Sequence, residues 1–316
     1  MTLLEVRNLV KNHNVKGRVL QAVSDVSLSI DPGETLALVG ESGCGKSTVG
    51  RSILQLPGPD SGSVLFGGTD LAQLGEREMR RYRPKLQMVL QDPKAALNPR
   101  RRVRDLVAEG LLIAGRKGDL DTRIDAALTA VGLDPVQVSD RRPYQFSGGQ
   151  CQRIAIARAI ALEPELIVCD EPVASLDVSM QAQVVNLLDD LRSRRALALL
   201  FISHDLSVVR AISDRVAVMY LGRIVECGPV AEVYSRPAHP YTRALLDSSP
   251  VPDPEAPPPG PALAGEVPSP LDPPSGCRFR TRCPMAEDIC AREVPQLRSV
   301  DREHTAACHF APQVAA

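Results

Sequence analysis

Long apolar runs are missing from this 316-residue chain. The longest one, Ala196–Ile202, is far shorter than the ~20 residues that a membrane-spanning helix needs. The N-terminal residues form neither a basic segment nor an apolar one, so no signal peptide is predicted. We therefore expect a soluble chain, for which any role at a membrane comes through partner chains.

An excess of charge of one sign is missing too. The net charge is −1, whereas nucleic-acid-binding domains usually carry a clear basic surplus, so no nucleic-acid partner is expected. Hydrophobic residues make up 44% of the chain and charged residues 24%, which is ordinary for one globular domain with an appendage. A local basic cluster is interpreted as the solvated entrance of a helix: Arg100, Arg101, Arg102 and Arg104.

Short apolar runs alternate with helical periodicity from Leu3 to about Ser235, which predicts an α/β sheet with covering helices. Strands are expected at residues 35–39, 86–90, 166–169 and 197–202. Helices are expected at residues 46–56, 103–114, 123–131, 149–162 and 178–194. Ser175 or Asp177 is expected to cap the last of these helices.

The composition changes after residue 235. Eleven prolines between residues 250 and 274 exclude a helix or a central strand there, so residues 236–276 are predicted to be a helix and a Pro-rich linker. Residues 277–316 hold four of the eight cysteines, separated by five, six and seventeen residues: Cys277, Cys283, Cys290 and Cys308. Four thiolates in so short a segment can bind zinc or an iron–sulfur cluster. The other cysteines are expected to be thiols that fill small spaces.

A glycine-rich turn lies between the strand at 35–39 and the helix that follows it. Its residues match the phosphate-binding loop (P-loop) pattern in full: Gly40, Glu41, Ser42, Gly43, Cys44, Gly45, Lys46, Ser47 and Thr48. Glycines let backbone N–H groups surround a β-phosphate, and the helix N-terminus adds partial positive charge. Lys46 is expected to reach the β- and γ-phosphates, and the Ser47 hydroxyl to ligate Mg²⁺.

Two acids end the predicted strand at 166–169. Asp170 is placed to hold Mg²⁺, and Glu171 to orient and polarise an attacking water as a general base. His204, directly after the strand at 197–202, is a candidate contact to a γ-phosphate.

A second anion-binding helix start is predicted, because it offers a hydroxyl, open backbone amides and a helix dipole: Ser147, Gly148, Gly149 and Gln150. One triphosphate needs only one phosphate cradle, so the presence of two indicates a pair of cassettes arranged head to tail. Each cassette would lend this helix to the nucleotide of the other.

In this order the motifs resemble an ABC ATPase over essentially all of residues 3–235. The resemblance implies a P-loop NTPase cassette in residues 1–235, with a mixed sheet, covering helices and a helical subdomain at about residues 92–162. It makes Gln91 a Mg²⁺ ligand that contacts a transmembrane partner, Asp177 a residue that communicates across the dimer, and His204 a switch histidine. Three residues depart from the usual pattern of this family. Phe146 precedes the signature motif Ser147–Gln150, Cys151 follows it, and His13 stands in place of an adenine-stacking aromatic residue.

A narrower resemblance is to the second ATPase of the dipeptide/oligopeptide importers, carried by residues 91–100, 172–179 and 239–246 and by the cysteines of the tail. Such subunits work with a paralogous ATPase, two transmembrane permeases and an extracytoplasmic solute-binding protein. They lie peripherally on the cytoplasmic face of the inner membrane. The resemblance also implies a [4Fe–4S] cluster on the four tail cysteines, and a cargo of peptides, nickel or a related small solute.

A soluble ABC ATPase that acts on ribosomes or DNA is the alternative. Ribosome-acting types typically carry two cassettes in one chain, and only one P-loop is present here. DNA-acting types separate the P-loop from the signature by a long coiled coil, whereas here about a hundred residues without sustained heptads intervene. A regulatory module that binds ATP without hydrolysis is disfavoured by the presence of Glu171 and His204. The sequence therefore predicts transport-coupled ATP hydrolysis.

Overall fold

The computed structural model describes residues 2–116, 118–248 and 265–312, which form two compact units. The first unit comprises residues 1–3, 30–35 and 73–202, and the second comprises residues 4–29, 36–72 and 203–316. Within the described residues, no helix combines the length and the apolar character that crossing a bilayer demands. Most of the predicted Pro-rich linker, residues 249–264, lies outside the described residues.

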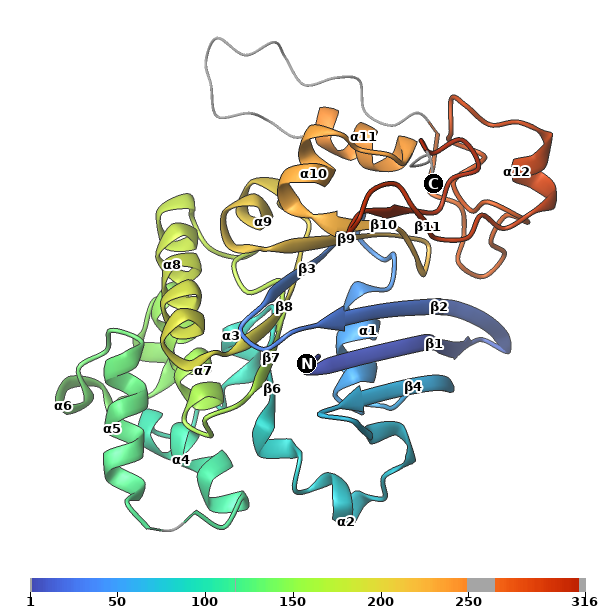
Figure 1. The fold of residues 1–316 in the computed structure, drawn as a ribbon. Coiled ribbons are helices and arrows are strands. Elements are labelled where there is room, and N and C mark those ends of the chain that lie inside the picture. The colour runs from blue at the N-terminus through green and yellow to red at the C-terminus, as the bar shows by residue number, and fades with distance from the viewer. Residues whose placement is uncertain (1, 117, 249–264, 313–316) are drawn as a thin grey trace, which may run out of the picture. The chain divides into compact units, whose positions relative to one another are not determined.

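The first unit combines a parallel sheet with a group of helices (Figure 1). Its strands are ordered β8 (Ala198–Ser203), β7 (Leu166–Asp170) and β6 (Leu86–Val89). All five residues of β7 are buried, as expected for a parallel strand covered on both faces. The helices are α2 (Glu76–Met79), α3 (Pro93–Ala96), α4 (Val103–Ile113), α5 (Leu120–Ala130), α6 (Pro135–Val138), α7 (Gly148–Ile160) and α8 (Val178–Arg195).

Helix α7 is the central helix of this unit. It contacts α3, α4, α5, α8 and strand β6, and nine of its thirteen residues are buried. Alanines and isoleucines supply most of that buried surface, because small and branched side chains let neighbouring helices approach closely on several sides. The N-terminus of α7 is thereby held at a fixed place in the unit.

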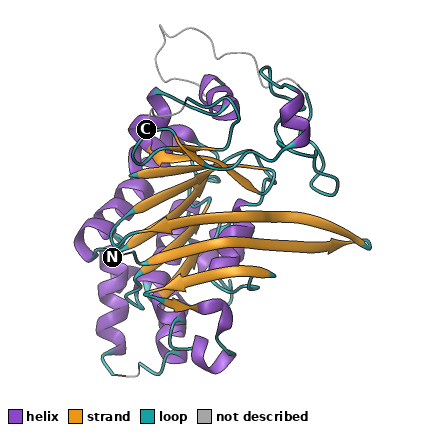
Figure 2. Ribbon diagram, turned by 45° about the vertical axis from the view of Figure 1, so that its right-hand side comes forward, coloured by secondary structure: helices purple, strands orange, loops and turns teal. Residues whose placement is uncertain are grey.

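The second unit contains two sheets. One is antiparallel, in the order β2 (Arg18–Ile30), β1 (Leu4–Val15), β4 (Ser61–Phe66) and β5 (Thr69–Asp70), and its long β1–β2 hairpin stands out in Figure 2. The other has the order β11 (Arg298–Ser299), β12 (Thr305–Ala306), β10 (Arg223–Pro229), β9 (Arg215–Tyr220) and β3 (Thr35–Val39). The helices are α1 (Lys46–Ile53), α9 (Leu206–Ile212), α10 (Val230–Ser235), α11 (Pro240–Asp247) and α12 (Asp288–Arg292).

The elements predicted from periodicity are all present, with ends that differ by up to three residues. Of the two predicted caps, Asp177 is the one that caps α8, because its carboxylate accepts the Met180 N–H at 2.9 Å. The antiparallel sheet and the strands β9 to β12 were not predicted. The division into residues 1–235, 236–276 and 277–316 stays a prediction.

A buried carboxylate joins the C-terminal strands to the rest of the second unit. The side chain of Glu226 on β10 is fully buried and accepts the backbone N–H groups of Ala238 at 2.7 Å and His239 at 2.8 Å. Its Oε1 also lies 2.7 Å from Nε2 of His304, which directly precedes β12. Because a buried charge is tolerated only with such partners, Glu226 fixes three separate segments in one arrangement.

Replacement of Glu226 by alanine is expected to lower the free energy of unfolding by about 3 kcal/mol or more, since two amides and a histidine lose their acceptor in the interior. Glu232→Ala is the control, because that glutamate lies on the neighbouring helix α10 and pairs only with Arg236 at the surface. Glu232→Ala should lower the free energy of unfolding by less than about 1 kcal/mol. Urea denaturation of both variants tests this expectation, and equal losses would contradict it.

Candidate functional site

The P-loop of the second unit takes its shape from close backbone packing. Gly40 has φ of +150°, and a Cβ built there would lie 2.1 Å from the carbonyl oxygen of Met219 on β9. Gly45 has φ of +108°, and its Cβ would lie 2.1 Å from the carbonyl oxygen of Ala22 on β2. Only glycine fits at both positions. The loop therefore passes against two strands and enters α1 at Lys46, without a Cβ at Gly40, Gly43 or Gly45.

Lys46 lies under this loop. Its side-chain ammonium donates to the carbonyl oxygens of Gly40 at 2.7 Å and Glu41 at 3.1 Å, and the residue is only 5% exposed. The thiol of Cys44 lies 3.9 Å from the ammonium nitrogen, and burial raises the pKa of that thiol. A cation held inside a loop of open amides is the arrangement that binds polyphosphates.

The two predicted acids lie at the carboxyl end of β7 in the first unit. Asp170 is the last residue of the strand and is 3% exposed. Glu171 follows with φ of +48°, a strained value for a non-glycine residue, and its N–H donates to the Ile202 carbonyl at 3.0 Å. Gln91 donates its side-chain N–H to the Glu171 carboxylate at 2.8 Å. The structure thus brings Gln91 and Glu171 together, although 80 residues separate them.

The predicted second phosphate-binding helix start is the N-terminus of α7. Ser147 caps the helix: its hydroxyl accepts the Gln150 N–H at 3.3 Å, while the Gln150 side chain accepts the Ser147 N–H at 3.1 Å. A Cβ at Gly149 would lie 1.9 Å from the Met180 side chain, so this glycine lets α8 approach. Ser147 is exposed, and the helix end has the form that suits an anion.

Other predicted residues have plain local roles in the structure. Asp177 is the cap of α8, and the N–H of Met180 holds the pKa of its carboxyl low. Cys151 is fully buried, with its thiol 3.4 Å from the Pro143 carbonyl, so it fills space where a polar residue is usual. His13 is exposed on β1, and His204 is exposed directly after β8.

Three of the four tail cysteines have thiols with raised pKa values: Cys277, Cys283 and Cys308. Burial, and then the neighbouring thiols, raise the pKa of Cys277 to about 11, and the same causes raise the pKa values of Cys283 and Cys308. However, no group of three or more His, Cys, Asp or Glu side chains within the described residues is arranged to hold a metal ion. The expectation of a [4Fe–4S] cluster is therefore unsupported by the described part of the chain.

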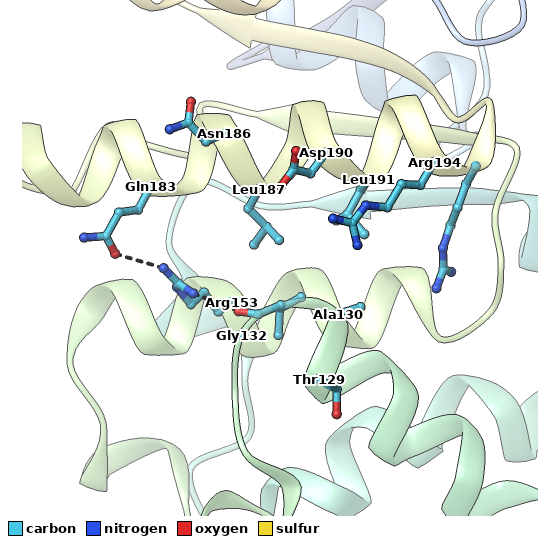
Figure 3. Close-up of a pocket in the computed structure, with 12 residues that line it drawn as sticks. Thr129, Ala130, Gly132, Arg153, Gln183, Asn186, Leu187, Asp190, Leu191 and Arg194 are labelled. Carbon is cyan, nitrogen blue, oxygen red and sulfur yellow. Dashed lines mark hydrogen bonds between the residues drawn. The ribbon is translucent and has the colours of Figure 1, made fainter.

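A separate cavity of about 440 Å³ opens in the first unit, between the end of α5 and helices α7 and α8. Figure 3 shows Arg153 from α7 reaching across it to Gln183 of α8, a hydrogen bond of 2.9 Å. None of the predicted nucleotide-site residues lines this cavity. The candidate functional residues are therefore considered within each unit: the second unit holds the P-loop, and the first unit holds the two predicted acids and the N-terminus of α7.

Two residues at the P-loop were missed by the sequence reasoning. The hydroxyl of Tyr241 on α11 accepts the Glu41 N–H at 2.9 Å, and the guanidinium of Arg282 binds the Glu41 carboxylate. Both residues fall in segments noticed only for their likeness to a family. Nothing in their local sequence indicates which part of the chain they contact.

Gly45 meets two requirements of the loop, a positive φ and the absence of a Cβ, and substitutions can separate their costs. Gly43→Ala is the matched control, because Gly43 has φ of +79° but nothing within 4 Å of its Cβ position. The control should therefore cost about 1–2 kcal/mol of unfolding free energy from backbone strain alone. Gly45→Ala should cost on the order of 3 kcal/mol or more, because the Ala22 carbonyl must also move. Chemical denaturation measures both, and equal costs would refute the close approach.

Comparisons with known proteins agree with this geometry. The family profile described as ABC transporter matches residues 23–174, and the one described as the C-terminal region of oligopeptide/dipeptide transporters matches residues 225–290. A peptide import ATP-binding protein of Brucella ovis is 53% identical, over 97% of each chain. The oligopeptide transport ATP-binding protein AppF of Bacillus subtilis is 47% identical, over 98% of this chain and 97% of its own.

Among solved structures, the dimeric ATP-binding cassette MJ0796, bound to ADP and phosphate, is similar with a TM-score of 0.66 and 27% identity. The match covers 72% of this chain and 98% of the cassette. These likenesses span both the nucleotide-binding part and the C-terminal part of the chain. The chain therefore belongs to the ABC transporter family, among the ATP-hydrolysing subunits of peptide and oligopeptide importers.

Proposed function

We propose that this chain hydrolyses ATP at its P-loop in order to drive the uptake of peptides through a membrane complex. The observation that carries the proposal is the P-loop itself, with Lys46 held inside it and glycines at the two positions that admit no side chain. Membership of the importer family makes this loop an ATP site. The alternative of a soluble ABC ATPase on ribosomes or DNA has no support in either observation.

Binding of the triphosphate falls to residues of the loop. Backbone amides of the loop surround the β-phosphate, and Lys46 exchanges its bonds to the Gly40 and Glu41 carbonyls for bonds to phosphate oxygens. Ser47, Gln91 and Asp170 supply oxygen donors, which are the ligands that Mg²⁺ prefers. Because Gln91 donates to Glu171 through its nitrogen, its amide oxygen is the atom suited to the cation. When bound, Mg²⁺ offsets the charge of the phosphates.

Hydrolysis falls to Glu171 as the general base. Its carboxylate is oriented by the Gln91 amide, and its backbone is fixed by the Ile202 carbonyl, so it can hold and deprotonate an attacking water. His204 contacts the γ-phosphate, and His13 stacks on the adenine. Each of these roles follows the family likeness of the residue concerned.

A second cassette completes the site in this proposal. Ser147 and the amides of Gly148, Gly149 and Gln150 face the nucleotide of the partner cassette, and Asp177 communicates between the two. The capped but exposed N-terminus of α7 suits this role, because its helix dipole points at solvent. The similar cassette MJ0796 is dimeric with ADP and phosphate bound. We expect the partner here to be a paralogous ATPase.

The remaining partners are expected to lie in and outside the membrane. We propose two transmembrane permease subunits and an extracytoplasmic solute-binding protein, with this chain peripheral on the cytoplasmic face of the inner membrane. The names of the Brucella and Bacillus relatives support peptide import as the transport activity. The match of residues 225–290 to the C-terminal region of such transporters supports the same cargo.

Glu171→Gln is expected to retain ATP binding while lowering turnover by roughly 10²–10⁴-fold, the usual weight of a positioned general base. It should also trap a dimer with ATP between its cassettes, detectable by size-exclusion chromatography with MgATP. Glu165→Gln makes the same chemical change at an exposed glutamate paired with Lys85 and should leave turnover unchanged. Wild-type turnover in Glu171→Gln would sink the assignment.

We further propose, from the family likeness alone, that the four tail cysteines bind a metal centre, an iron–sulfur cluster before zinc. Protein purified without oxygen should then absorb broadly in the visible range and contain iron. Cys290→Ser should lose both, while Cys227→Ser, outside the tail, should keep them. Elemental analysis that finds zinc instead would overturn the cluster, and protein that holds neither metal would refute the site.

A further inference from the structure

One segment of the tail contacts the P-loop directly. The guanidinium of Arg282 donates to both oxygens of the Glu41 carboxylate, at 2.7 Å and 3.0 Å. The Arg282 side chain is only 4% exposed, and the hydrogen bonds to Glu41 raise its pKa. Its guanidinium also lies 5.9 Å from the ring centre of Tyr220 on β9. A two-bonded, partly buried pair of this kind fixes orientation as well as charge.

Glu41 is itself tied to the ammonium group that the loop encloses. Its carbonyl oxygen accepts a bond from Lys46, and its backbone N–H donates to the hydroxyl of Tyr241. The side chain, the amide and the carbonyl of this one loop residue are therefore each held by a different partner. Loss of the Arg282 contact frees the part of Glu41 that is anchored to the tail, and leaves an unpaired carboxylate on a residue of the P-loop.

A second arginine of the same segment supports the other end of the loop. Arg278 donates to the carbonyl oxygen of Leu221, to the Gln21 side chain at 2.7 Å and to the Ser24 hydroxyl at 3.0 Å. The residue after Leu221, Gly222, donates its N–H to the carbonyl of Cys44 at 2.8 Å. Arg278 thus binds the turn at Leu221–Gly222, and this turn binds the P-loop at Cys44.

Aromatic packing keeps the segment in place between these two contacts. The ring of Phe279 lies 5.2 Å from that of Tyr220, 5.4 Å from that of Tyr241 and 5.6 Å from that of His239. Burial lowers the pKa of His239 to about 4, so its ring stays neutral and accepts the Tyr241 N–H at 3.0 Å. That bond caps α11, the helix that carries the Tyr241 hydroxyl to the loop.

We propose that the tail segment Gly276–Cys283 positions the P-loop, and that Arg282 is the positioning residue, acting on bound nucleotide through Glu41. The proposal rests on the proposed function, because it assigns a role in ATP binding to a segment outside the nucleotide motifs. Arg282 neutralises the one acidic side chain of the loop and holds the loop open around Lys46. A change in the arrangement of the C-terminal region therefore changes the affinity of the P-loop for nucleotide.

The test measures the affinity of the full-length chain for MgADP, which occupies the loop without being hydrolysed. Arg282→Gln should weaken MgADP binding by about tenfold, because the loop proposed to bind the phosphates then carries an unpaired negative charge. The double variant Glu41→Gln/Arg282→Gln removes both charges and should recover most of that loss. Arg282→Lys keeps the charge but makes at most one of the two bonds, so its affinity should be intermediate.

Arg280→Gln is the matched control. Arg280 lies in the same turn, carries the same charge and bonds only to Ser275, so its loss should leave the MgADP affinity unchanged. If Arg282 only docks the tail, Arg282→Gln lowers the unfolding midpoint, keeps the wild-type affinity, and the double variant recovers nothing. That result would overturn the proposal.

If Arg282→Gln does not fold, the MgADP affinity of Arg282→Lys is the test. A wild-type affinity in that variant would contradict the positioning role of Arg282. A wild-type chain that binds neither MgADP nor MgATP would instead refute the proposed function. A wild-type chain that binds both, with an Arg282→Gln variant that binds equally well, refutes the positioning role alone.

Discussion

Two backbone carbonyls determine the form of the nucleotide loop. The carbonyl oxygens of Ala22 and Met219 lie where a Cβ would project from Gly45 and Gly40, so only glycine fits at these two positions of the loop. The loop has little freedom left, and its amides are already arranged when a phosphate arrives. Binding then costs little ordering entropy, which is the general advantage of a preorganised anion site. The Lys46 ammonium lies inside the loop, where it donates hydrogen bonds to the carbonyl oxygens of Gly40 and Glu41.

The C-terminal region depends on polar contacts more than on a core of its own. Few of its side chains are buried, among them Phe279, Cys290 and Ala306, which is little apolar surface for a segment of that length. Its arginines Arg278 and Arg282 instead bind partners on the sheets and the P-loop. Such pairs contribute modest stability, since desolvation offsets much of the attraction, but a shifted arrangement would leave a charge unpaired. The region therefore has one position in which it can dock, and that position includes the P-loop.

The sequence predicts local structure and misses contacts made across long separations. The P-loop, the two acids at the end of β7 and the helix start at Ser147 are each marked in the sequence by residues within a few positions, and the structure places these residues between the predicted strands and helices. The β1–β2 hairpin was missed because burial along β1 stops alternating after Val6, where the register shifts between Arg7 and Val10. The contact of Arg282 with Glu41 joins residues 241 positions apart, and no periodicity encodes such a pairing. The spacing of the tail cysteines likewise says that they can gather, and says nothing of the geometry a metal needs.

Strained residues mark the places where distant segments act on the site. Glu171 and Leu221 both have positive φ without being glycine, at +48° and +40°. Such strain persists only where the surroundings determine the backbone on several sides. Glu171 is fixed by the Ile202 carbonyl and by Gln91, and the carbonyl of Leu221 is bound by Arg278. In each unit, therefore, a residue beside a predicted functional motif keeps an unfavourable conformation because a partner far along the chain binds it. Glu171 in the first unit and the P-loop in the second unit are each held by contacts within their own unit, and a change in a distant segment of that unit reaches them through these few contacts.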